Sequence, residues 1–153
     1  SIIYPDRHPI NYRDRSQPSR HMKLRAAIRN LDTRAQQYID HHMSHSYLHE
    51  RRHEFRQEKF YRVTHEDRER SKLLVEFKRY SVKCSRLLFN LVVALNEFAD
   101  TVRATIDLDF CRREGKFAIQ DSMGVMKPYL EGKIFMPDRY FPNDGLDELP
   151  AEE

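Results

Sequence analysis

The strongest hydrophobic pattern of the chain lies between residues 74 and 102. Apolar or small side chains recur there at steps of three and four, which is the spacing of one face of an α-helix. A second row that starts at Leu73 widens the stripe, as in helical bundles and coiled coils. The pattern predicts a helix over about residues 65–106, and its core-facing stripe is Leu74, Phe77, Ser81, Cys84, Leu88, Leu91, Leu95, Phe98 and Val102.

A weaker stripe of the same period precedes this segment. No proline or glycine interrupts residues 19–62, so the pattern predicts a first helix over about residues 20–62. Two long helices joined by a short connection predict an antiparallel hairpin. The stripe of the first helix begins with Leu24, Ile28, Leu31, Ala35 and Tyr38.

Beyond residue 106 the periodicity weakens, and the prediction changes to one or more shorter C-terminal helices. Gly115 and Gly124 are the positions at which such a helix would bend or end. The expected fold class is therefore all-α: a long hairpin, shorter C-terminal helices, and extended arms at both ends.

Three regions follow from the distribution of proline. Residues 1–18 form an extended arm in which proline alternates with tyrosine and arginine, because proline disfavours helix around it. Residues 19–126 form the helical domain, and residues 127–153 form a strap rich in proline and aromatic residues with an acidic tail. The arm is too apolar for a plain linker, so we expect it to lie on a protein surface, its own or a partner's. The residues expected to bind a partner are Tyr4, Tyr12, Arg13 and Arg15.

Composition supports long, solvated helices, since 33% of the residues are charged and only four are glycine. The charge is unevenly distributed. Residues 1–62 carry 13 Lys and Arg against 7 Asp and Glu, whereas residues 107–153 carry 6 against 11. A basic front and an acidic end favour docking to charged partners or to a second copy. No apolar run reaches the length of a membrane span.

Cysteine usage bears on the compartment. Cys84 and Cys111 form no C-x-x-C pair and define no disulfide framework. Two free thiols favour a reducing compartment such as the cytoplasm, with an organelle matrix left open, and no targeting segment is visible.

Five of the eight histidines lie in the stretch HHMSHSYLHERRHEF, residues 41–55. If the first helix continues to residue 62, these histidines prolong its buried stripe and meet the small residues of the second helix. The preferred interpretation is a polar layer in a helical core, since buried imidazoles find hydrogen-bond partners there. A second interpretation is a zinc site made by His45, His49 and His53, because histidines four apart share a helix face.

A third interpretation comes from His49-Glu50-Arg51-Arg52-His53, which matches the H-E-x-x-H pattern of zinc hydrolases. In that chemistry the two histidines hold zinc and Glu50 acts as the base. Two arginines between the histidines suit a solvated helix face better than a dication site. A third zinc ligand would have to come from near the predicted turn, from a residue such as His65 or Glu66.

The leading functional hypothesis is a non-enzymatic protein, without a cofactor, that acts as a subunit or adaptor of a larger assembly or associates with itself. Ordering extended arms costs about 1–2 kcal/mol per residue in backbone entropy, which suits a clamp on other chains better than an isolated enzyme. The alternatives are nucleic-acid binding through the basic N-terminal half and zinc-dependent hydrolysis through His49, Glu50 and His53.

Overall fold

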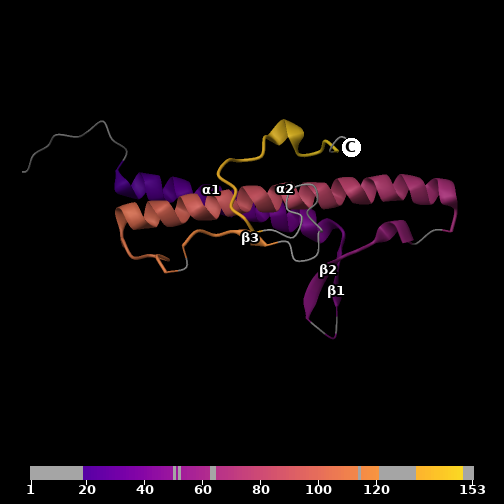
Figure 1. The fold of residues 1–153 in the computed structure, drawn as a ribbon, viewed down its shortest axis with the longest axis horizontal. Helices are drawn as coiled ribbons and strands as arrows, with labels where there is room; N and C mark the ends of the chain where they lie inside the picture. The colour runs from indigo at the N-terminus through magenta and orange to yellow at the C-terminus, as the bar shows by residue number, and fades with distance from the viewer. Residues whose placement is uncertain are drawn as a thin grey trace, which may run out of the picture.

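The computed structural model describes residues 19–49, 51, 53–62, 65–113, 115–120 and 134–149. The predicted partner residues Tyr4, Tyr12, Arg13 and Arg15 lie outside these ranges. Two long helices dominate the structure, α1 (Arg20–Ser44) and α2 (Asp67–Thr105), and they run antiparallel side by side (Figure 1). The predicted mostly helical hairpin is therefore confirmed.

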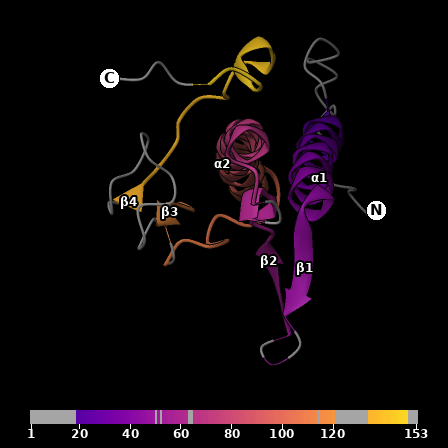
Figure 2. The same ribbon diagram turned by 90° about the vertical axis from the view of Figure 1, so that its right-hand side faces the viewer.

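Helix α2 is the central element of the described structure. In Figure 2 it lies between α1 on one side and the small sheet of β3 and β4 on the other, with the C-terminal segment passing above it. Because α2 has neighbours on several sides, its apolar residues are not confined to a single stripe. Within the described residues, the hydrophobic core lies on α2 and, through one residue, on β3: Tyr80, Cys84, Leu87, Val92, Val93, Ala94, Ala99, Val102 and Ile119.

The two ends of α2 agree with the predicted range of about 65–106. Asp67 and Glu69 lie in its first turn, where negative charge is favourable beside the helix dipole. At the other end the backbone amides of Ile106 and Asp107 both donate to the carbonyl of Val102, at 2.9 and 3.1 Å. These bonds close the last turn where the sequence periodicity weakens.

Helix α1 begins as expected, with the Ser19 hydroxyl accepting a hydrogen bond from the amide of Met22 at 3.3 Å. It ends at Ser44, so the prediction that it continues to about residue 62 is wrong. Two hydroxyl groups donate hydrogen bonds to carbonyls in the last turn of the helix. Ser44 Oγ donates to the carbonyl of His41 at 2.6 Å, and Tyr80 Oη, which comes from α2, donates to that of His42 at 2.6 Å.

A β-hairpin replaces the predicted second half of the first helix. Strands β1 (Ser46–His49) and β2 (Glu54–Gln57) pair antiparallel, from Ser46 opposite Gln57 to His49 opposite Glu54. His53, in the connecting turn, has a φ of 51°, a left-handed conformation that histidine adopts more readily than most residues. The hairpin projects away from the helices (Figure 1).

The chain returns to α2 through a 3₁₀ turn, η1 (Phe60–Arg62), which packs where α2 extends beyond the end of α1. The rings of Phe60 and Tyr61 lie 5.6 and 5.1 Å from that of Phe77. This aromatic contact covers the part of α2 that the predicted longer helix would have covered.

After α2 the chain forms turns over residues 106–113 and a two-stranded sheet, β3 (Ile119–Gln120) with β4 (Ile134–Phe135). Shorter C-terminal helices were predicted beyond α2. Within the described residues there, the only helical segment is the 3₁₀ turn η2 (Asn143–Gly145). Ile119 anchors the sheet, because its buried side chain packs on Val92.

Two expectations about the chain as a whole can be compared with this fold. Across the described ranges, no helix has both the length and the apolar character needed to cross a membrane. Cys84 is buried, Cys111 is half-buried, and no disulfide joins them.

Candidate interaction surface

One edge of the helical hairpin is closed by the C-terminal segment, and a buried asparagine on α2 holds that segment in place. Asn90 is fully buried. Its Oδ1 accepts from the amide of Phe141 at 2.5 Å, and its Nδ2 donates to the carbonyl of the same residue at 3.3 Å. The side-chain amide therefore pairs with the backbone of Phe141 much as a neighbouring strand would.

A buried arginine holds the next part of the same segment. Arg86, only 5% exposed, donates from Nη1 to the carbonyls of Gly145, Leu146 and Glu148. Its guanidinium also lies 4.6 Å from the centre of the Phe141 ring. A guanidinium has five N–H donors and no acceptor, so a group of converging carbonyls is a suitable partner for it inside the protein.

Tyr140 ties the C-terminal segment to both helices. Its hydroxyl donates to Glu97 on α2 and accepts from Nδ2 of Asn30 on α1 at 2.6 Å. The guanidinium of Arg34, also on α1, lies 4.5 Å from the centre of the Tyr140 ring. Burial raises the pKa of Tyr140 to about 12, so the hydroxyl stays protonated and continues to donate.

An ion pair reinforces this closure near the end of the described chain. The Nζ atom of Lys83 lies 2.9 Å from Oδ1 of Asp147. The hydrogen bond from Lys83 lowers the pKa of the Asp147 carboxyl. Asp147 is exposed, so we expect this pair to add little stability by itself.

The other side of α1 is open. Although α1 has 25 residues, none of them is buried. Ile28, Ile39 and Met43 are 48%, 49% and 42% exposed. We refer to the apolar stripe on this side as the open α1 face. It consists of the exposed Ile28, Ile39 and Met43, with the half-buried Leu24, Leu31 and Ala35 beside them.

The position of the open α1 face follows from helical geometry. At about 100° per residue, Ile28 and Ile39 lie about 20° apart around the helix. Asn30 and Arg34, which contact Tyr140, lie on the far side of the helix from them. The C-terminal segment therefore covers one side of α1 and leaves the side that carries Ile28 and Ile39 uncovered.

The histidines at the end of α1 pack against aromatic rings. The His41 ring nitrogen Nε2 lies 3.0 Å from the Tyr80 carbonyl, and the His45 ring lies 4.5 Å from Phe60 and 5.0 Å from Tyr80. The His42 ring lies 5.7 Å from that of Tyr38. These contacts link α1, η1 and α2 at the point where α1 ends.

The predicted zinc ligands do not share a helix face, because α1 ends before all three of them. His45 is the residue that follows α1, the backbone of His49 ends β1, and His53 lies exposed in the hairpin turn. The two histidines of the H-E-x-x-H pattern are therefore not on a helix, and Glu50 is outside the described residues. The described part of the chain contains no group of three or more His, Cys, Asp or Glu side chains arranged to hold a metal. Zinc binding by these histidines stays a prediction.

Acid should weaken the fold through His41. Burial is the largest influence on this side chain, and it lowers the pKa of His41 below the ordinary histidine value. A folded-state pKa below the unfolded one means that stability is complete above about pH 6.5 and is lost as the pH falls below it. We expect His41→Gln to remove part of this loss, measured as the free energy of unfolding in urea between about pH 7 and pH 5. An unchanged pH dependence in the variant would contradict the assignment.

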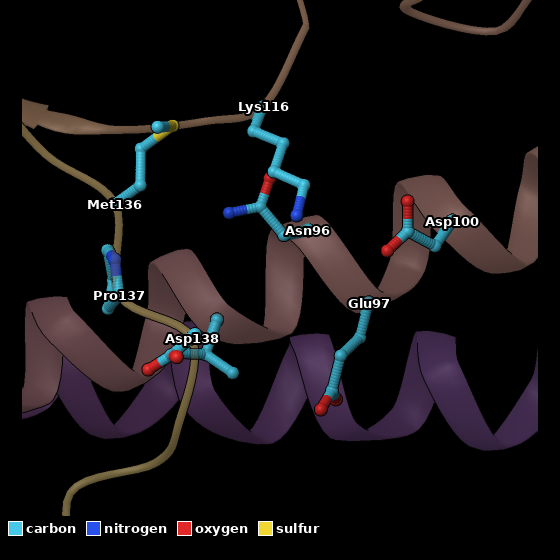
Figure 3. A pocket seen from close by; sticks show the side chains of 8 residues that line it. Asn96, Glu97, Asp100, Lys116, Met136, Pro137 and Asp138 are labelled. Carbon is cyan, nitrogen blue, oxygen red and sulfur yellow. The ribbon is translucent and has the colours of Figure 1, made fainter.

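A pocket of about 290 Å³ lies where α2 meets two segments distant in sequence (Figure 3). Its polar groups mostly serve the fold. Asn96 exchanges two hydrogen bonds with the backbone of Phe117, Glu97 accepts from Tyr140, and Asp100 pairs with Arg103. In Figure 3, Glu97 points toward α1. The residues that line the pocket are Val93, Asn96, Glu97, Asp100, Lys116, Met136, Pro137 and Asp138.

Comparison with known proteins found no protein family, no curated protein and no solved structure that matches this chain significantly. Function is therefore inferred from the surfaces of the molecule itself.

Proposed function

We propose that this protein is a non-enzymatic assembly subunit whose helical hairpin binds a protein partner through the open α1 face. The observation that carries the proposal is that α1 has an apolar stripe but no buried residue. Isolated helices are marginal in water, and most helical stability in proteins comes from packing an apolar face. A partner that covers this face would supply that packing.

The size of the effect supports a partner. Full burial of an isoleucine side chain stabilises by about 1.5–3 kcal/mol, so covering the exposed half of Ile28 or Ile39 contributes about 1 kcal/mol each. Met43, which is 42% exposed, adds to this along the same side. Contiguous apolar surface of this kind, bordered by charged residues, is typical of interaction sites.

The remainder of the hairpin is suited to hold this face in place. Tyr140 bridges Asn30 on α1 and Glu97 on α2, so the C-terminal segment fixes the spacing of the two helices. A face that is already positioned loses less conformational freedom on binding, which increases affinity.

The open α1 face favours a protein partner over the two alternatives. A nucleic acid would be held by cations, and α1 has exposed Arg20, Lys23, Arg25 and Arg29 in its first half, but phosphates give no reason for an apolar stripe beside them. Hydrolysis by the H-E-x-x-H stretch requires both histidines on one helix, which this hairpin does not provide.

Site-specific photo-crosslinking tests the proposal. We expect a photo-reactive group attached at Ile39→Cys to form a discrete covalent adduct with a protein when the full chain is expressed in its native cells. Thr33→Cys is the matched control, since Thr33 is exposed on α1 but lies away from the open α1 face. The adduct should disappear when Ile28→Asp is added. Equal labelling at both positions, or no adduct at Ile39, would contradict the proposal.

A further inference from the structure

We infer that the partner on the open α1 face is a second copy of this chain, packed with its α1 antiparallel to the first. The inference rests on the proposed function, which leaves the identity of the partner unspecified. Two features of α1 carry it: the symmetric placement of its exposed apolar residues, and the distribution of charge along one flank.

The two exposed isoleucines of α1 are placed symmetrically about its middle. Ile28 and Ile39 lie equally far from the point between Thr33 and Arg34, and so do the half-buried Leu24 and the exposed Met43. In an antiparallel pair centred there, Ile28 faces Ile39 of the second copy, and Leu24 faces its Met43. These two pairs thereby join apolar residues across the twofold axis, as suits an isologous interface.

Charge along one flank selects the antiparallel orientation. The first half of α1 carries Arg20, Lys23, Arg25 and Arg29 with no acidic residue before Asp32. Helical geometry places Arg25, Arg29 and Asp40 on the same flank of the open α1 face. A twofold axis brings equivalent flanks together, so Asp40 of the second copy lies within about 3 Å along the axis of both Arg25 and Arg29. A parallel pair would bring opposite flanks together and would leave Arg25 and Arg29 away from Asp40 of the second copy.

Nothing in the described fold obstructs this arrangement. The C-terminal segment contacts α1 through Asn30 and Arg34, on the far side of the helix from Ile28 and Ile39. Asp40 accepts a hydrogen bond from Gln36, one turn earlier on the same helix, at 2.7 Å, and it remains exposed. The interface is closed by its symmetry, so the expected product is a dimer and not a filament.

Sedimentation equilibrium of the full chain tests the inference through charge reversal. The wild-type chain should dimerise. Arg29→Asp and Asp40→Arg should each weaken dimerisation by about tenfold or more. The first creates two like-charge contacts per dimer, and the second, which faces both Arg25 and Arg29, creates four. An equimolar mixture of the two variants should dimerise more tightly than either variant alone, since both cross-pairs between positions 29 and 40 then join Asp with Arg. Arg139→Asp, at an exposed position on the C-terminal segment, is the matched control and should leave dimerisation unchanged.

The outcomes separate this inference from the proposed function. If the wild-type chain is monomeric at every concentration while the Ile39 adduct contains a different protein, self-association is overturned and the proposed function stands. If the mixture fails to regain affinity, the antiparallel pairing is overturned. If the chain is monomeric and no adduct forms, both are overturned. Circular dichroism of each variant shows that the helices are intact.

Discussion

Replacing Asn90 with alanine should lower the free energy of unfolding by about 2–4 kcal/mol, one of the largest effects expected from a single substitution in this chain. The side chain is fully buried, and its amide satisfies both the N–H and the C=O of Phe141. Alanine would leave two buried backbone groups without partners, each at a cost of about 1–3 kcal/mol, although some relaxation toward water reduces the sum.

Asn96→Ala is the matched control for this prediction. Asn96 makes the same pair of hydrogen bonds, to the N–H and C=O of Phe117, but in a solvent-exposed setting. Water can replace the lost amide there, so we expect a loss of about 1 kcal/mol or less. Urea denaturation of both variants measures the difference. Equal losses would show that burial does not determine the strength of these backbone clamps.

The second helix could be predicted from the sequence because its stability depends on a pattern within one segment. Apolar steps of three and four over residues 74–102 identify α2 almost to its ends, Asp67 and Thr105. The detail of its core could not be predicted in the same way. Leu88, Leu91 and Leu95 are only half-buried, while Val92 and Val93, off the predicted stripe, are buried. Helix α2 packs against neighbours on several sides, and their positions depend on distant parts of the chain.

The end of the first helix was not predictable from periodicity. Histidines 42, 45, 49 and 53 continue the spacing of the stripe, so nothing in the local pattern marks a stop. The helix ends because Tyr80, 38 positions further on, reaches its last carbonyls and because η1 fills the space beyond them. A contact between residues so far apart in sequence overrides helix propensity, as tertiary context often does.

The candidate interaction surface could be predicted only in part from the sequence. Ile28 and Ile39 are apolar positions of an amphipathic helix, but only the placement of α2 and the C-terminal segment shows that their side is uncovered. Asn90 interrupts the apolar run LLFNLVVAL, which marks it as a buried polar side chain in need of a partner. Its partner, Phe141, lies 51 positions away in sequence, and no local signal connects them.

Replacing Tyr80 with alanine should cost about 3–5 kcal/mol, because it removes a buried aromatic ring from the contact between α1, η1 and α2. Tyr80→Phe separates the hydroxyl from the ring. Burial raises the pKa of Tyr80, so the hydroxyl stays protonated and donates to the His42 carbonyl at 2.6 Å. Its loss should cost about 1–2 kcal/mol, since one carbonyl at the end of α1 then lacks its partner.

The region in which amide hydrogen exchange becomes faster shows whether the Tyr80 hydroxyl determines the end of α1. If Tyr80 ends α1, then Tyr80→Phe should speed amide hydrogen exchange over the last turn of α1, residues 41–45, and leave exchange in the middle of α2 nearly unchanged. Tyr61→Phe is the control, because it keeps the ring that packs 5.1 Å from Phe77 and removes a hydroxyl from another member of the same aromatic cluster. Faster exchange throughout α2 in Tyr80→Phe, or the same local effect in Tyr61→Phe, would mean that the hydroxyl of Tyr80 does not define where the first helix ends.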